Sequence, residues 1–261
     1  MDHVMQLFPA FLLVLCRISS FFVVAPVFST MNVPTAFKIG LAFFVSMLVF
    51  LTVGAGSPIA VDGAYLVSML KEIAVGLLLG FSAYLFFTVV QTSGAFMDLQ
   101  MGFGVANVVD PLTGVSSPMF GNLKYMLMIL VFLSMNGHHY LLQAIMNSYR
   151  WIPLDSHFFQ AVYGGQVSQF LARTFADTFM LALQISAPLV CAMFLADVGL
   201  ALLARTAPQF NVFVVGIPIK ILVGLAMLVL LMTGFGTLFQ MLFDRMLAAL
   251  QKLLDIVQAA G

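Results

Sequence analysis

Charged residues are so scarce and so widely spaced that they decide what this chain can fold into. Only 8% of its 261 residues are charged and 62% are hydrophobic, whereas ordinary soluble domains carry about 25% charged residues. The longest stretches without Asp, Glu, Lys or Arg are 18–37, 39–61, 73–97, 125–149, 178–196 and 221–243. A soluble fold of this size has too little interior to bury so much apolar surface. The sequence therefore predicts an integral membrane protein.

The uncharged runs predict an all-α fold of about six long helices, arranged as membrane-type hairpins. Helices are expected at about 4–24, 39–56, 71–97, 123–147, 178–204 and 219–256. Pro26 and Pro34 break the run 18–37, so the first helix is placed earlier and contains Arg17. From Asp244 onward, charged and apolar residues alternate at helical spacing, which predicts an amphipathic C-terminal helix. Six crossings of about 20 residues each leave no room for a large soluble domain.

One segment between the expected helices, 102–121, combines many apolar residues with residues that interrupt helices. It contains glycines and prolines at positions that prevent a helix, yet it is too apolar for a solvated linker. At membrane depth, irregular backbone survives only when it is buried in protein or lines a watery cavity. We therefore expect 102–121 to lie inside protein.

Several function classes are disfavoured by what the sequence lacks. Ten basic residues balance ten acidic ones, so no basic stripe is available for nucleic acid. The sequence holds no phosphate-binding P-loop and no nucleophile motif. His138 and His139 are adjacent and so point about 100° apart on a helix, whereas helical metal sites prefer a spacing of four. Cys16 and Cys191 lie in apolar runs, where they are interpreted as small hydrophobic residues. We expect no enzyme activity, cofactor or metal.

A few charged residues lie in or beside the apolar runs and are candidate functional positions. They are Arg17, Glu72, Asp98, Asp177, Asp197 and Arg205. A central Arg or Asp costs about 2.5–3.5 kcal/mol on insertion scales, so each needs a partner or a wet cavity. Two interpretations stay open: a transport pathway or proton relay, and a set of structural ion pairs inside a helical bundle.

Two glycines four residues apart, Gly76 and Gly80, predict a helix-packing interface. Small residues at this spacing let a second helix approach closely when lipid offers no hydrophobic driving force. The second helix could belong to the same chain or to a partner.

A series of motifs along nearly the whole chain resembles the FliR family of type III export-gate proteins. It begins with Arg17, Pro26 and the stretch 34–38, and continues with Glu72-x-x-x-Gly76-x-x-x-Gly80, Gly94 to Phe103, Asp110-Pro111 and Asn136-Gly137-His138. The most specific motif is Pro208-Gln209-Phe210-Asn211-Val212-Phe213-x-x-Gly216-x-Pro218-x-Lys220. The Asp-Pro and Asn-Gly-His elements make the chain look like the flagellar member of the family rather than its injectisome counterpart, SctT.

The resemblance implies a non-enzymatic core subunit of the flagellar export gate, located in the bacterial inner membrane at the flagellar basal body. It implies FliP-like and FliQ-like partner chains in a helical cone around a secretion pore, with the complex largely raised out of the plane of the membrane. It also implies contacts with FlhB-like and FlhA-like proteins and with lipid, and exported flagellar proteins as cargo.

The resemblance further divides the chain into a FliP-like part over about 1–175 and a FliQ-like hairpin over about 178–261, which includes the amphipathic C-terminal helix. The hairpin turn motif comprises Pro208, Gln209, Asn211, Gly216, Pro218 and Lys220. The loop at about 104–121 looks like a plug in the closed pore, with Asp110, Pro111, Pro118 and Met119 as plug residues.

A function of another class remains as the alternative. A self-contained secondary transporter could use the buried carboxylates, including Asp177 and Asp197, together with the broken segments. Composition leaves the two functions close to even, whereas the motif at 208–220 and the Asp110-Pro111 loop favour the gate.

Overall fold

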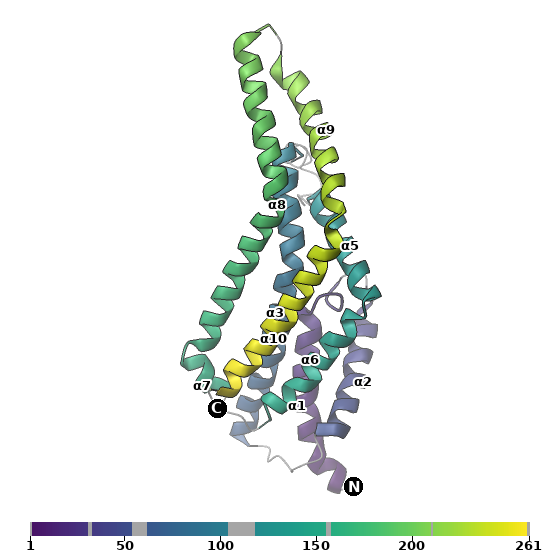
Figure 1. The fold of residues 1–261 in the computed structure, drawn as a ribbon. Coiled ribbons are helices and arrows are strands. Elements are labelled where there is room, and N and C mark those ends of the chain that lie inside the picture. The colour runs from purple at the N-terminus through teal and green to yellow at the C-terminus, as the bar shows by residue number, and fades with distance from the viewer. Residues whose placement is uncertain are drawn as a thin grey trace. The chain divides into compact units, whose positions relative to one another are not determined.

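The computed structural model describes residues 2–30, 33–53, 62–103, 118–154, 158–209 and 211–259, and every regular element among them is a helix. The helices are α1 (Asp2–Val24), α2 (Thr35–Val53), α3 (Gly63–Met101), α5 (Met119–Ser134), α6 (Gly137–Trp151), α7 (Phe158–Tyr163), α8 (Gln166–Thr206), α9 (Val212–Met232) and α10 (Phe235–Ala259), as Figure 1 shows. The expected all-α class is confirmed.

Two expected helices are broken. The helix expected over 123–147 is divided into α5 and α6, which are bent by 73° relative to each other. Asn136 at this break has φ 57°, in the left-handed region that ends a helix and that Asn tolerates well. The helix expected over 219–256 is divided into α9 and α10, and Gly234 N donates to Leu231 O across the break. Hydropathy continues across both breaks, which is why the charge pattern did not mark them.

The hairpin turn is shorter than expected. Helix α8 ends at Thr206 and α9 begins at Val212, so Gly216, Pro218 and Lys220 lie within α9 and only the first part of the turn motif forms the connection. Helix α8 also begins at Gln166 rather than near 178, and it continues through Pro188.

The chain divides into two compact units, each built from separate stretches. Unit 1 comprises Met1–Leu85, Phe132–Phe175 and Asp244–Gly261, and unit 2 comprises Phe86–Val131 and Ala176–Phe243. Helices α3, α5, α8 and α10 each contribute to both units.

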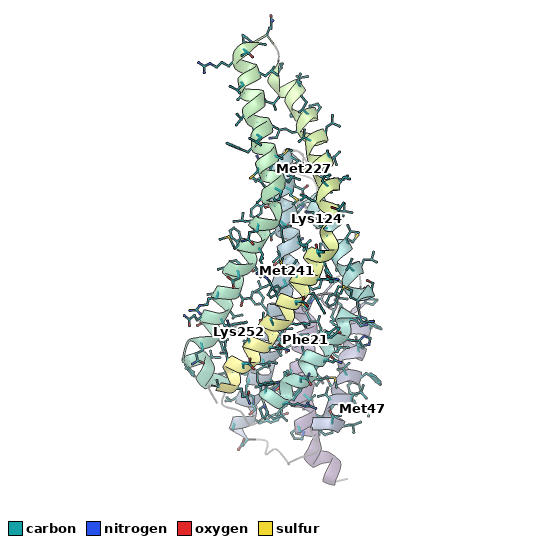
Figure 2. All side chains as sticks on the ribbon, in the orientation of Figure 1. Phe21, Met47, Lys124, Met227, Met241 and Lys252 are labelled. Atoms are coloured by element: carbon teal, nitrogen blue, oxygen red, sulfur yellow. The ribbon has the colours of Figure 1, made fainter. Side chains whose placement is uncertain are left out.

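Unit 1 is packed around α1. Phe21 of α1 is fully buried, and Phe11 meets the rings of Phe43 and Phe50 of α2 edge to face, with centroids 5.6 and 5.8 Å apart. On the outer side of α2, Met47 is half exposed; Figure 2 labels it together with Phe21. The C-terminal part of α10 buries one apolar face, comprising Met246, Leu250, Leu253, Leu254 and Val257, and exposes Asp244, Arg245, Lys252 and Asp255. The amphipathic helix predicted here therefore packs on its own chain.

Unit 2 has its core where α3 and α5 meet the α8–α9 hairpin. The core cluster consists of Met97, Met101, Phe120, Leu189, Met193 and Leu228. By length and composition, α2, α3, α8 and α9 are suited to cross a membrane, and the bent pair α5–α6 could supply a fifth span in the described part of the chain.

Candidate functional site

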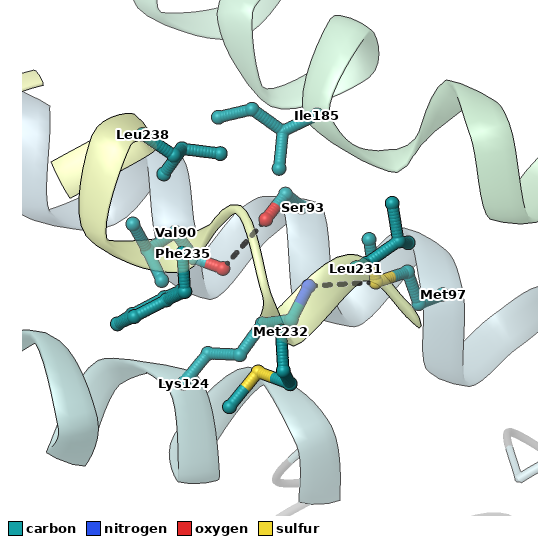
Figure 3. Close-up of a pocket in the computed structure, with 9 residues that line it drawn as sticks. All are labelled: Val90, Ser93, Met97, Lys124, Ile185, Leu231, Met232, Phe235 and Leu238. Carbon is teal, nitrogen blue, oxygen red and sulfur yellow. Dashed lines mark hydrogen bonds between the residues drawn. The ribbon is translucent and has the colours of Figure 1, made fainter. Parts of the chain in front are cut away.

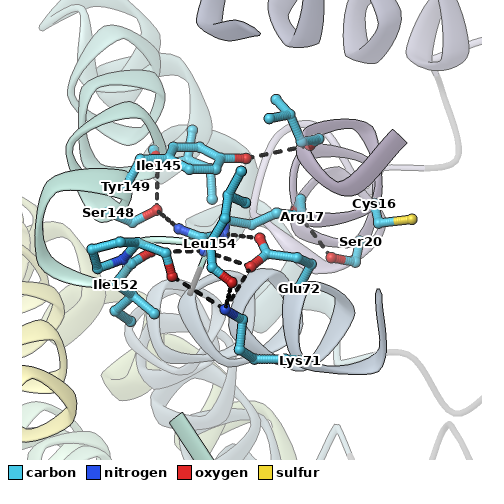
Figure 4. A network of polar contacts seen from close by, with 12 residues as sticks. Cys16, Arg17, Ser20, Lys71, Glu72, Ile145, Ser148, Tyr149, Ile152 and Leu154 are labelled. Atoms are coloured by element: carbon cyan, nitrogen blue, oxygen red, sulfur yellow. Dashed lines mark hydrogen bonds and ion pairs between the residues drawn. The ribbon is translucent and has the colours of Figure 1, made fainter. Parts of the chain in front are cut away.

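The buried charges of unit 1 form one network, which Figure 4 shows. The Arg17 guanidinium donates to both carboxylate oxygens of Glu72, with Nε to Oε2 at 2.5 Å and Nη2 to Oε1 at 2.9 Å. It also donates to Ser148 Oγ at 3.0 Å and Ile152 O at 2.9 Å. The guanidinium carbon lies 4.0 Å from the centroid of the Tyr149 ring. Both charged side chains are fully buried, and their contacts join α1 and α3 to α6.

Lys71 adds a second cation to this network. Its ammonium donates to Pro153 O at 3.1 Å and to Leu154 O, and it lies 3.4 Å from Glu72 Oε1. The carbonyls that Arg17 and Lys71 bind follow directly after α6, where the partial negative charge of a helix end favours cations. These carbonyls therefore place partial negative charge beside the two cations.

Gly76 and Gly80 face α1 of the same chain. A Cβ at Gly76 would overlap Arg17 O and Ser20 Oγ, and a Cβ at Gly80 would come 3.0 Å from Phe21 O. The absence of side chains at both positions therefore allows α1 and α3 to approach closely inside unit 1.

Asp98 of unit 2 joins the end of α3 to the start of α5. Its carboxylate accepts from Phe120 N at 3.1 and 3.2 Å and from Gly121 N at 3.3 Å, which caps the first turn of α5. Its backbone carbonyl accepts from Phe103 N at 3.0 Å, and the Phe103 and Phe120 rings lie 5.5 Å apart. One residue thus holds both ends of the segment predicted to be a plug.

The predicted plug residues fall partly outside the described residues. Asp110 and Pro111 lie outside them. Pro118 immediately precedes α5, and Met119, the first residue of α5, is 65% exposed.

The α8–α9 hairpin carries its own ion pair. Lys220 Nζ lies 2.9 and 3.0 Å from the two carboxylate oxygens of Asp197, and Gln100 Nε2 of α3 donates to Asp197 at 3.5 Å. Gly216 faces Leu200 across the hairpin, since a Cβ there would come 3.0 Å from Leu200 Cδ1.

The other predicted positions lie at the surface. Pro208, Gln209, Asn211 and Pro218 are exposed near the tip of the hairpin, and Asp177 is exposed on α8. The structure therefore brings Arg17 together with Glu72 and Asp197 together with Lys220, in two different units.

Sequence reasoning did not single out Lys71, Lys124 or Ser148 as site residues. Lys124 borders the uncharged run 125–149, and Lys71 precedes Glu72, which borders the run 73–97; these positions were the available signal. Ser148 lies among other polar residues of α6 and has no local feature to mark it, because its partner Arg17 is 131 residues away in sequence.

The network and the ion pair both join side chains and backbone groups of different helices. Within the described ranges, no group of three or more His, Cys, Asp or Glu residues could hold a metal ion. The donors and acceptors are instead arranged to hold helices together in an apolar surrounding, where an unpaired polar group is costly.

Comparison with known proteins places the chain in a family. Residues 8–246 match the family described as bacterial export proteins, family 1. The flagellar biosynthetic protein FliR of Bacillus subtilis (strain 168) is 42% identical over 258 residues, which cover 98% of this chain and 99% of that protein. FliR of Escherichia coli (strain K12) is 28% identical over 92% of this chain and 91% of that protein. The Yop proteins translocation protein T of Yersinia pestis is 39% identical over 61% of this chain and 60% of that protein. The chain therefore belongs to family 1 of the bacterial export proteins, together with the flagellar FliR proteins.

Proposed function

We propose that this chain is a structural, non-enzymatic subunit of the flagellar type III protein-export gate in the bacterial inner membrane. The observation that carries the proposal is the likeness to a flagellar biosynthetic protein over nearly the full length of both chains. The shorter likeness to a Yop translocation protein supports a role in type III export. The protein works in this role by assembling with other chains around a path for exported flagellar proteins.

The length of the exposed apolar surface on α8 supports assembly with partner chains. The surface extends from Phe175 to Leu203, which is about 42 Å along a helix, whereas a bilayer core is about 30 Å thick. Its members include Phe175, Phe179, Met180, Phe194, Leu195, Val198, Leu202 and Leu203. This length exceeds what an untilted helix exposes to a bilayer core, which favours cover by neighbouring protein over part of the surface. FliP-like and FliQ-like chains are the proposed neighbours, with FlhB-like and FlhA-like proteins nearby.

Co-expression provides the test of assembly. The full chain, expressed with FliP-like and FliQ-like chains and extracted in mild detergent, should purify as one complex with them, and deletion of its gene should abolish motility. A secondary transporter would instead carry out its function alone or as a homo-oligomer, without the other chains. Purification of a stable, active homo-oligomer, with no association to the other chains, would refute the gate function.

We also propose that the loop at about 104–121 plugs the closed pore, and that the chain consists of a FliP-like part over about 1–175 and a FliQ-like hairpin over about 178–261. The anchoring of Phe103 and Phe120 by Asp98 supports a plug, because it fixes both ends of the loop at one place. Since these ends lie close together, deleting 110–116 leaves enough residues to bridge them and spares Pro118 and the first turn of α5.

Deletion of 110–116 should therefore give an assembled complex that conducts ions in the closed state and slows growth on induction. A variant in which 110–116 is replaced by a Gly/Ser sequence of equal length is the matched control for loop length, and it should leak as well. Full assembly of both variants without added conductance would refute the plug.

A further inference from the structure

A cavity of about 50 Å³ inside unit 2 contains the ammonium group of Lys124, as Figure 3 shows. Helices α3, α5, α8, α9 and α10 contribute its walls. Most of the lining is apolar and comes from Val90, Ile185, Leu231, Met232, Phe235 and Leu238. The function proposed above makes no use of this cavity.

Lys124 is only 5% exposed, and its protein contacts leave its ammonium undersatisfied. The ammonium has three protons, and its hydrogen-bond partner is Met97 Sδ at 2.8 Å, a weak acceptor. No carboxylate oxygen of a described residue lies within 4.0 Å of Lys124 Nζ. Asp98, the acidic residue beside Met97, attracts Lys124 electrostatically, but it directs both oxygens to the N–H groups of Phe120 and Gly121 and makes no hydrogen bond with the ammonium.

The cavity walls give the ammonium no hydrogen-bond partner besides Met97. Ser93 is the other polar residue of the lining; its hydroxyl donates its proton to Val90 O at 2.8 Å, and it makes no hydrogen bond with Lys124. A buried cation with unsatisfied donors costs several kcal/mol unless an acceptor or a counter-charge is added. The cavity has space for more than one water-sized group, because one such group needs about 10–15 Å³ by this measure.

We propose that this cavity binds one compact anionic group through Lys124. The group is compact, of the size of a chloride ion or a carboxylate, because the cavity between the five helices holds only a few water-sized groups. It comes either as a free ion or as the acidic side chain of a neighbouring chain in an assembly, and the chemistry at Lys124 is the same in both cases.

The test compares anions at equal ionic strength on the full chain purified in mild detergent. Chloride and formate should raise the unfolding temperature by about 3–6 °C relative to gluconate, which is too large for the cavity. Lys124→Met should abolish this difference. Ser93→Ala, in the same wall, is the matched control and should keep it, because the Ser93 proton is already donated to Val90 O.

A second experiment, on the chain assembled with its partner chains, identifies the source of the anion. An anion response that persists in the complex identifies a free ion, whereas a response seen only in the isolated chain identifies a carboxylate of a partner.

The first experiment, on the isolated chain, does not depend on the proposed function. Equal unfolding temperatures in all three anions, or an unchanged response in Lys124→Met, would overturn the proposal. If Lys124→Met does not fold, Lys124→Gln takes its place.

Discussion

The buried charges of unit 1 are not equivalent, because one carboxylate serves two cations. Glu72 binds Arg17 through both oxygens and also lies 3.4 Å from Lys71. Removal of Arg17 leaves a lysine–carboxylate pair behind, whereas removal of Glu72 takes the same carboxylate away from two buried cations. Breaking a buried pair by removing one partner is more harmful than replacing both partners.

Glu72→Gln should therefore destabilise the chain more than Arg17→Met does. We expect a loss of about 3–5 kcal/mol for Glu72→Gln and a smaller loss for Arg17→Met, measured by thermal unfolding and by accumulation in membranes. Tyr149→Phe is the control, since it keeps the ring beneath the Arg17 guanidinium and removes only a 3.3 Å hydrogen bond to Val14 O. Equal losses for the two charge variants would contradict this account.

Replacing single glycines by alanine should destabilise the α1–α3 contact to different degrees. Gly76→Ala should be strongly destabilising because the new methyl group meets the Arg17 carbonyl oxygen, and Gly80→Ala should be milder because its nearest atom is 3.0 Å away. Gly40 of α2 has open space around its Cβ position, so Gly40→Ala should be neutral or stabilise by up to about 1 kcal/mol through helix propensity. Unfolding temperatures in any other order would show that α1 and α3 do not pack as described.

At the scale of the elements, the sequence predicted where helices lie better than where they break. Uncharged runs located the helical regions because helices in apolar surroundings exclude charge. The breaks at Asn136 and Gly234 lie inside such runs, where composition stays uniform and only a local backbone conformation changes. The family resemblance implied a turn motif that extends to Lys220, yet α9 begins at Val212 and continues through Pro218. The partner of Arg17 could not be predicted, because nothing local links α1 to Glu72.

The start of α5 depends on a side chain from α3. Asp98→Ala removes the acceptor for Phe120 N and Gly121 N, and loss of such a cap costs about 0.5–2 kcal/mol. We expect faster hydrogen exchange at these two amides with little change in the α8–α9 hairpin. Asp98→Asn keeps one acceptor oxygen and should lie between wild type and Asp98→Ala. Unchanged exchange at Phe120 and Gly121 in Asp98→Ala would show that the cap does not hold α5.

At the scale of the whole molecule, the balance of exposed and buried apolar surface distinguishes the two long helices. In the most apolar stretch of α3, 61% of the residues are buried, whereas in that of α8 only 11% are buried. Both helices are about twice as long as a bilayer core is thick. The chain therefore covers most of this stretch of α3 itself and leaves most of that of α8 exposed.

A charge placed on the outer face of α8 should separate folding from assembly. Leu202 is 61% exposed near the end of α8 and lies outside the uncharged run 178–196. Leu202→Arg should leave the unfolding temperature of the isolated chain within about 2 °C of wild type, because exposed surface positions contribute little to stability. It should abolish co-purification with partner chains and hence motility, since a buried unpaired cation is costly in an interface. Tyr163→Arg, at a position 89% exposed on α7, is the matched control and should preserve both. Normal assembly of the Leu202→Arg variant would mean that no partner covers this part of α8.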